Sequence, residues 1–392
     1  MRVCIDPSTS INQIGSSFNT FDCVVCAMKK ICIICPAVYP LLKESEEIQS
    51  AGGAEAQLKV LGLALADRGY EIHYIVDDFG QRDTEKINDV TVHKVALKYM
   101  GGPKYYFIPA WIKLWRTLFR IKADIHIIKI PRHILLLLGA FCKLYKKKIV
   151  FLSQTDRDVD PKLIKETENV LSYWFFRLGL TCIDYVVVQN RKQEKGFIEK
   201  YGKDAAIIRS IITLPEANPI HKQKYILWVG NNRPEKQPEK FLELARSLPE
   251  YKFVMIMSYI SPRYEIPSIH NLQFLGFVPF VKIAKYFQQA SLLVSTSVLE
   301  GFPNTFLQAW QYSTPVVSLH VDPDDVIKKN DLGRHSETFE KMKEDVKELM
   351  DNEVVRMKIG ENAKRYVQAH HAPEVILPQY IKLFKQLYGD GG

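Results

Sequence analysis

The stretch VSTSVLEGFPNTFLQAWQYSTPVVSL, residues 294–319, places a carboxylate and a glycine between an expected strand and an expected helix. A helix that begins near Asn304 would leave the backbone N–H groups of residues 304–306 free to bind an anion. Glu300 can accept hydrogen bonds from hydroxyl groups, and Gly301 lets a ligand approach the backbone. A carboxylate beside an anion site suits a neutral, hydroxylated group, and a sugar meets that description.

Two other segments carry groups that suit the same ligand. WVGNNRPEKQPEK, residues 228–240, sets Arg233 and Lys236 in a loop after an expected strand, where fixed cations would bind an anionic group. A solvated loop with ordinary surface charges is the other interpretation, and the combination with LEGFPNTF favours the functional one. SAGGAEAQL sets Gly52 and Gly53 before an expected helix, a pattern that also suits a plain turn.

The elements that must position these residues repeat in two halves. ICIICP, GGAEAQLKVLGLALADRG and YEIHYIV are typical of a strand, a helix and a strand, and the strand-like runs DIHIIKI, KIVFL and DYVVVQ follow. After the polar linker TLPEANPIHKQ the cycle begins again with YILWVG, PEKFLELARSL, FVMIMS, NLQFLG, SLLVS and PVVSL. Ligands of open parallel sheets bind beyond the carboxyl ends of the strands, so two doubly wound α/β domains predict a site in the cleft between them.

These runs also set the expected domain boundaries. Residues 1–27 are an extension outside the fold, because MKKICIICP from Met28 is typical of a natural protein start. Residues 28–215 form the first Rossmann-like domain and residues 216–372 the second. Residues 373–392 are a final helix that packs back on the first domain.

Composition narrows the class of protein. The apolar share of 47% fits a globular chain, and the net charge of +9 favours phosphates, whether of nucleotides, nucleic acid or an anionic membrane. Seven cysteines form no disulfide framework, and the pairs Cys23/Cys26 and Cys32/Cys35 are better explained without zinc, because the second pair lies in an apolar strand. A reducing cytoplasm is expected, with no signal peptide and no membrane-spanning run.

EGFPNTFLQAWQYSTPVVS resembles the donor-binding signature of the retaining glycosyltransferases of family 4, the group 1 glycosyltransferases. The resemblance covers nearly all of residues 28–388. It implies the GT-B fold, in which two Rossmann-like domains face a cleft. The first domain then lies on the acceptor side, and the second binds a nucleotide diphosphate sugar.

The resemblance also implies roles for individual residues. Glu300 matches the carboxylate that contacts the donor sugar, and Gln308 replaces a second Glu that binds the ribose hydroxyls. Lys236 matches a lysine that neutralises the diphosphate. Asn231 stands where the family usually carries an arginine, and Arg233 compensates from the same loop.

Two sets of site residues follow from these matches. The residues predicted as catalytic are Glu300, Lys236 and Arg233. Those predicted to bind the donor are Gly52, Gly53, Gly230, Asn231, Gly301, Phe302, Asn304, Thr305 and Gln308. Phe306 and Trp310 of the same helix are assigned to the core by their spacing. No metal ion and no cofactor besides the donor substrate, of UDP or GDP type, is expected.

On the acceptor side, many relatives carry a histidine where this chain reads FLSQTDRD. Asp156 of this segment is predicted as an acceptor-side group, with a helix cap or a solvated turn as the alternative. His126 lies within a strand and is assigned a structural role.

Residues 98–122 interleave aromatic and basic residues at helical spacing. Trp111, Leu114, Trp115 and Leu118 share one face, and LLLLGAF before KLYKKK adds a second apolar and basic surface. Peripheral contact with an anionic membrane is one interpretation. Amphipathic helices that cover the sheet are the other.

The predicted function is retaining transfer of a sugar from a nucleotide diphosphate sugar to a glycan or lipid-linked glycan, in surface polysaccharide or glycolipid synthesis. The alternative is a catalytically impaired nucleotide-sugar-binding protein, since Asn231 and Gln308 depart from the family pattern. No nucleic acid partner is expected, because the basic residues are scattered. The expected location is the cytoplasm, and attachment to the inner face of the cell membrane is a further interpretation.

Overall fold

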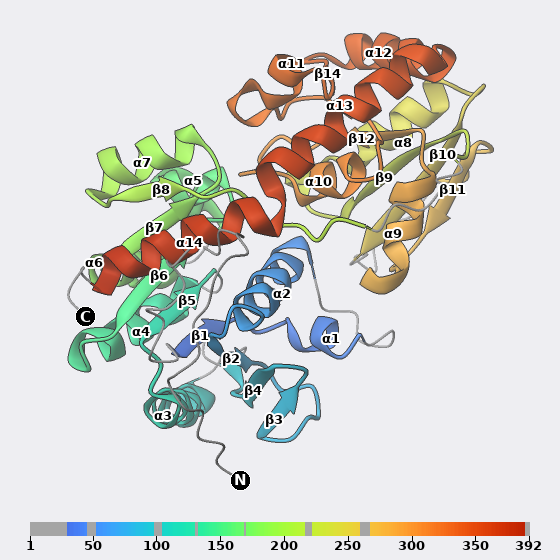
Figure 1. Cartoon of the computed structure of the whole chain (residues 1–392). Coiled ribbons are helices and arrows are strands. Elements are labelled where there is room, and N and C mark those ends of the chain that lie inside the picture. Colours follow the sequence, from blue (N-terminus) through green and yellow to red (C-terminus); the bar gives the residue numbers. More distant parts are fainter. Residues whose placement is uncertain are drawn as a thin grey trace, which may run out of the picture.

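The computed structural model describes residues 30–44, 52–97, 104–129, 132–167, 170–215, 222–258 and 267–388. The predicted extension over residues 1–27, the start at Met28 and the middle of the predicted linker lie outside these residues. The described chain forms two parallel β-sheets flanked by helices, one in each half of the molecule (Figure 1). Two doubly wound α/β domains are therefore confirmed.

The sheet of the first domain has the strand order β3-β4-β2-β1-β5-β6-β7-β8, and only the β3/β4 pair is antiparallel. Its strands are β1 (Lys30–Ile34), β2 (Glu71–Val76), β3 (Thr84–Ile87), β4 (Val90–Lys94), β5 (Ile125–Ile128), β6 (Lys148–Leu152), β7 (Tyr185–Val188) and β8 (Ala205–Ile207). Its helices are α1 (Tyr39–Leu42), α2 (Gly53–Ala66), α3 (Lys104–Ile121), α4 (Arg132–Leu144), the 3₁₀ helix η2 (Asp156–Val159), α5 (Pro161–Thr167), α6 (Val170–Cys182) and α7 (Arg191–Tyr201).

The sheet of the second domain is parallel throughout, with the order β11-β10-β9-β12-β13-β14. Its strands are β9 (Tyr225–Asn231), β10 (Lys252–Ser258), β11 (Leu272–Leu275), β12 (Leu292–Ser295), β13 (Val316–Ser318) and β14 (Gly333–His335). Its helices are η3 (Pro234–Lys236), α8 (Pro238–Ser247), α9 (Phe280–Gln289), α10 (Asn304–Trp310), η4 (Pro323–Asp325), α11 (Val326–Asn330), α12 (Phe339–Asp351) and α13 (Glu353–His371).

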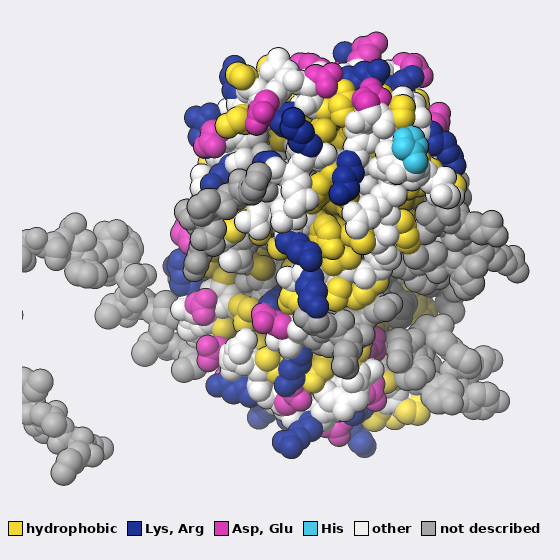
Figure 2. Space-filling model, turned by 90° about the vertical axis from the view of Figure 1, so that its right-hand side faces the viewer, with side chains coloured by type: hydrophobic (Ala, Val, Ile, Leu, Met, Phe, Trp, Pro, Cys, Tyr) yellow, Lys and Arg dark blue, Asp and Glu magenta, His cyan; other side chains and the backbone are white. Residues whose placement is uncertain are grey.

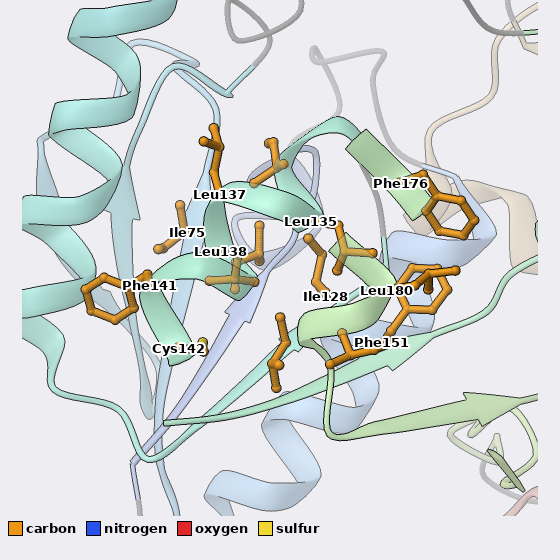
Figure 3. Close-up of a cluster of buried hydrophobic side chains, with 14 of the residues drawn as sticks. Ile75, Ile128, Leu135, Leu137, Leu138, Phe141, Cys142, Phe151, Phe176 and Leu180 are labelled. Carbon is orange, nitrogen blue, oxygen red and sulfur yellow. The ribbon is translucent and has the colours of Figure 1, made fainter. Parts of the chain in front are cut away.

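Strand β1 shows why the predicted strands read as continuous apolar runs. Successive side chains of a strand point to opposite faces, and both faces of this sheet are covered by helices. Cys32 and Ile34 accordingly lie in one core cluster, while Ile33 and Cys35 lie in another. Figure 3 shows part of the first cluster, where α4 and α6 pack beside the sheet. Both cysteines are buried, Cys32 within β1 and Cys35 directly after it.

The apolar face of α3 packs inward. Leu114 and Leu118 are fully buried, and Trp111 and Trp115 pack against the same core cluster. Leu135 of the LLLLGAF run is also buried, in the cluster of Figure 3. Of the two interpretations of this helix, a cover for the sheet therefore holds for the apolar face of α3, which packs on the core of the first domain. None of the helices in the described ranges is long and apolar enough to cross a membrane.

The final helix α14 (Pro373–Tyr388) belongs to the core of the first domain. Ile376, Leu377, Tyr380, Leu383 and Phe384 are buried in the cluster that also holds β1 and α2 residues. Figure 1 shows α14 leaving the second domain and lying along the first. The chain therefore passes between the domains twice, which limits how they move relative to each other.

Phe384→Ala is expected to lower the free energy of unfolding of the first domain by about 3–5 kcal/mol, because the side chain is 1% exposed and its loss leaves a cavity. Urea denaturation measures the change. Gln386→Ala, at an exposed position of the same helix, is the control and should leave stability nearly unchanged. A shift confined to the unfolding transition of the second domain would show that α14 is not part of the first core.

Candidate functional site

Two loops of the second domain meet because they follow adjacent parallel strands. β9 pairs with β12, so the loops after Asn231 and Ser295 emerge at the same edge of the sheet. The Thr296 hydroxyl donates to the carbonyl oxygen of Lys236 at 2.6 Å, and the Val298 N–H donates to that of Glu235 at 2.9 Å. These bonds fix the two loops to each other.

Lys236 and Glu300 form an ion pair between these loops. The Lys236 side chain is 26% exposed and the Glu300 side chain 13% exposed, so both are shielded but accessible from one side. The pair brings a cation and a hydrogen-bond acceptor into one small area. Such an area can bind a ligand that carries both an anionic group and hydroxyl groups.

The start of α10 differs from the prediction in one respect. The Phe306 N–H donates to the carbonyl oxygen of Pro303 at 3.1 Å, so it is not free to bind an anion. Phe306 and Trp310 are fully buried, which confirms their assignment to the core. The Phe302 ring packs on His371 with centroids 5.2 Å apart, so only the backbone of Phe302 is left for a ligand.

The remaining predicted residues of the second domain surround this area unevenly. Gln308 and Thr305 are partly exposed on α10. Asn231 ends β9, and its buried Oδ1 accepts no hydrogen bond from the residues that the structure describes.

Gly230 is required by sterics, because a Cβ there would lie 2.5 Å from the Trp228 ring. The Arg233 side chain is exposed, and within the described ranges the structure gives it no ion pair with Glu300.

Two of the predicted ligand-binding glycines lie where the domains touch. A Cβ at Gly301 would be 2.5 Å from the carbonyl oxygen of Gln154 and 2.5 Å from Gln193 Nε2, both in the first domain. A Cβ at Gly53 would be 2.8 Å from the Cβ of Asn304 in the second. We expected glycine at these positions to leave room for a ligand. In the structure the missing side chain at each position leaves room for atoms of the opposite domain.

Asp156 lies directly behind Gly301. Its carboxylate accepts hydrogen bonds from Asn190 Nδ2 at 3.0 Å and Gln193 Nε2 at 3.1 Å, and pairs with Lys192 at 3.0 Å. Asn190 Nδ2 also donates to the carbonyl oxygen of Gly301 at 2.8 Å. The alternative of a helix cap does not apply, since Thr155 occupies the cap position of η2. An acceptor-side role for Asp156 stays a prediction.

Several interface residues were missed by sequence reasoning. Asn190 bonds both Asp156 and Gly301, and Gln193 bonds Asp156. Gln57 of the first domain bonds Asn304 and itself accepts from Lys129. Lys129 directly follows β5 and Asn190 lies two residues after β7. A polar residue at the carboxyl end of a buried parallel strand is the signal that could have identified these two. Gln57 and Gln193 lie inside helices, where no pattern distinguishes them.

His371 lies at the second passage of the chain between the domains. Its Nδ1–H donates to the carbonyl oxygen of Ser210 at 2.7 Å, and its own carbonyl oxygen accepts from the Ile212 N–H at 3.0 Å. The ring is fully buried, and burial lowers its pKa from the ordinary 6.5 to about 3. His371 is therefore neutral in the folded protein at physiological pH.

This burial predicts acid sensitivity. Between pH 6.5 and about 3 the unfolded chain binds a proton at His371 that the folded chain does not. The stability that neutral, buried His371 contributes is fully present above pH 6.5. Below pH 6.5 the free energy of unfolding falls by up to about 1.4 kcal/mol per pH unit because of this group. His371→Asn, whose amide can keep the bond to Ser210, should make the decline shallower. Urea denaturation across this pH range measures it; the exposed His270→Asn should match the wild type.

Two doubly wound domains that touch through the loops at the carboxyl ends of their strands define the GT-B class of fold. Solved structures agree with this. The chain matches sucrose-phosphate synthase from Thermosynechococcus elongatus with a TM-score of 0.73 and 15% identity, over 92% of this chain and 99% of that one. It matches HepE of Anabaena, in complex with UDP and glucose, with a TM-score of 0.65 and 13% identity, over 91% and 100%.

The sequence comparisons identify the family. Residues 51–211 match the family described as Glycosyltransferase Family 4, and residues 210–366 match the one described as Glycosyl transferases group 1. An uncharacterized glycosyltransferase of Methanocaldococcus jannaschii is 24% identical over 92% of this chain and 100% of its own length. This chain belongs to the group 1 glycosyltransferases of family 4.

Proposed function

We propose that this protein transfers a sugar from a nucleotide diphosphate sugar to a glycan or lipid-linked glycan, with retention of the anomeric configuration. The observation that carries the proposal is the ion pair of Lys236 and Glu300 at the carboxyl ends of β9 and β12. Family membership and the UDP and glucose bound to the structurally similar HepE support it.

In this proposal each partner of the ion pair takes one part of the donor. Lys236 binds the diphosphate and balances the negative charge that develops as it leaves, without a metal ion. Glu300 accepts hydrogen bonds from the sugar hydroxyls, and Gln308 binds the ribose. The acceptor hydroxyl attacks from the face that the diphosphate leaves, and a phosphate oxygen takes its proton.

Calorimetric titration with UDP, GDP and ADP, with and without magnesium, tests the donor site. We expect one of the three to bind independently of the metal, and Lys236→Ala to weaken that binding at least about tenfold, since a charged hydrogen bond is lost. Lys240→Ala is the matched control, because Lys240 forms an exposed ion pair with Glu243 on α8 at 2.9 Å. Binding without turnover in an acceptor screen would favour the catalytically impaired alternative, and no binding of any nucleotide would contradict both.

We also propose that the first domain attaches reversibly to anionic membranes, through exposed residues of α3 and the end of α4. Ile112 and Phe119 of α3 are 45% and 57% exposed, and Leu144 and Tyr145 at the end of α4 are 63% and 41% exposed. The Phe119 and Tyr145 rings are 5.7 Å apart, so α3 and the end of α4 contribute to one surface, called here the α3–α4 patch.

Basic residues border this patch. A pocket of about 690 Å³ lies between α3 and the residues around β3 and β4, and its lining includes Lys94, Lys113, Arg116, Arg120 and also Asp83, which pairs with Lys113 at 3.0 Å. Exposed apolar groups next to cations suit the interface of an anionic membrane. Figure 2 shows one face on which Lys and Arg are interspersed with Asp and Glu over both halves.

Sedimentation with anionic vesicles at low salt tests the attachment. We expect wild-type protein in the pellet and the double variant Phe119→Ser/Leu144→Ser in the supernatant. Val354→Ser is the control, because Val354 is 79% exposed on α13 of the second domain, away from the patch. Wild-type protein that stays in the supernatant would contradict membrane attachment and leave the donor-site proposal unaffected.

A further inference from the structure

A buried lysine of the first domain is connected to the donor loop of the second. Lys129 follows β5 and is 6% exposed, yet it forms no ion pair with any carboxylate in the described ranges. Among the residues that the structure describes, its ammonium donates to Gln57 Oε1 on α2 at 2.6 Å. Gln57 Nε2 in turn donates to Asn304 Oδ1, four residues beyond Glu300. The three side chains therefore form one hydrogen-bonded chain across the domain boundary.

The chemistry of lysine fixes which group donates and which accepts in each of these hydrogen bonds. An ammonium group only donates, so Gln57 must turn its oxygen toward Lys129 and its NH₂ toward Asn304. Asn304 then meets Gln57 with its oxygen and holds its own NH₂ on the other side. That NH₂ lies against Gly53, where a Cβ would be 2.5 Å from the nitrogen. It donates to none of the residues that the structure describes.

We propose that Lys129 is a positioning residue that, through Gln57, orients the Asn304 amide so that its N–H groups donate to a phosphate oxygen of the bound nucleotide. The inference rests on the proposed function and adds a contribution of the first domain to donor binding. It gives a role to a buried lysine that forms no direct ion pair within the described residues: the ammonium fixes the polarity of an amide. Burial lowers the pKa of Lys129 to about 8, so the group remains mostly protonated near pH 7. Three titratable groups, Glu55, Cys35 and Asp158, act against burial and raise the pKa of Lys129.

Gln57→Glu is the decisive variant because it separates stability from orientation. The new carboxylate keeps the shape of the side chain and gains an ion pair with Lys129, so the melting temperature should be unchanged or higher. A carboxylate only accepts, however, so Asn304 must turn its NH₂ toward residue 57 and present its oxygen to the nucleotide. We expect the dissociation constant of the nucleoside diphosphate that the wild type binds to rise at least about tenfold, the loss expected for a charged hydrogen bond.

Three controls isolate the path through Asn304. Gln57→Glu in an Asn304→Ala background should weaken binding no further than Asn304→Ala alone, whereas a full additional loss would mean a direct charge effect and overturn the inference. Lys129→Met should weaken binding in the wild type and have no effect in a Gln57→Ala background. Gln379→Glu, on the exposed side of α14, adds the same charge elsewhere and should bind as the wild type does.

The outcomes separate this inference from the proposed function. If the wild type binds a nucleoside diphosphate and Gln57→Glu binds it equally well while remaining folded, the orientation role of Lys129 is wrong and the donor site stands. If the wild type binds UDP, GDP and ADP not at all, the proposed function fails and this inference fails with it. Thermal melting of each variant distinguishes lost binding from lost folding.

Discussion

Glu300→Gln is expected to lower kcat/KM for sugar transfer by about 10²–10³, a loss typical of removing one electrostatic group from a preorganised site. The substitution preserves shape and one acceptor oxygen but removes the charge that holds Lys236 in place. Lys236 then lacks a partner that orients it toward the diphosphate, and the sugar hydroxyls lose a charged acceptor. Steady-state assays of released nucleotide measure the effect.

The control for this prediction is Glu243→Gln. Glu243 forms an ion pair of ordinary geometry with Lys240, but its side chain is 51% exposed and lies on α8. Exposed pairs contribute little, so activity should stay within about twofold of the wild type. Nucleotide affinity gives a second readout, and it should fall as well, because Lys236 loses the partner that orients it toward the diphosphate. A Glu300→Gln variant that keeps full activity would show that the ion pair is structural and that the donor sugar binds elsewhere.

Gly301→Ala is expected to reduce kcat by about 10²-fold, the cost that a misplacement near 1 Å produces in an oriented site. The added Cβ would lie 2.5 Å from the Gln154 carbonyl oxygen, which is backbone and cannot move aside by changing a rotamer. The two domains must separate locally to relieve the overlap. That separation also strains the bond from Asn190 Nδ2 to the Gly301 carbonyl oxygen. Small-angle scattering should show a larger radius of gyration for the variant.

Gly276→Ala is the matched control, since a Cβ at Gly276 would meet no atom within 4 Å. It should leave activity, stability and the radius of gyration unchanged. A Gly301→Ala enzyme with wild-type activity and dimensions would mean that the contact between Gly301 and the first domain is not needed during catalysis. Urea denaturation of both variants checks that each domain remains folded.

The fold could be predicted from the sequence wherever the burial of a segment leaves an apolar pattern within that segment. Strand β1 is covered on both faces, so ICIIC appears as an unbroken apolar run. The β3/β4 hairpin was not predicted, because TEKI at the sheet edge has exposed residues and little apolar content. The sequence left two interpretations of α3 open because an amphipathic helix has the same pattern whether its apolar side meets a sheet or a membrane.

The donor loop could likewise be predicted because its residues are close in the chain. The strand, the turn at Glu300 and Gly301 and the helix that follows form one segment, and its pattern also led to the family. Lys236 was matched from a second segment, and its contact with Glu300 arises because β9 and β12 are neighbours in the sheet. Strand order is a property of the sheet, which neither segment encodes alone.

The sequence by itself determined two doubly wound domains, the family and the segments that carry the donor loop, because apolar periodicity and short motifs are local. Only the tertiary structure decided which groups meet across the domain boundary. Gln57 and Asn304 are 247 residues apart, and Asn190 and Gly301 are 111 apart. Such contacts depend on how two separately folded domains are placed by the two passages of the chain between them. A side chain two residues after a strand has the same local pattern whether it meets water or the opposite domain.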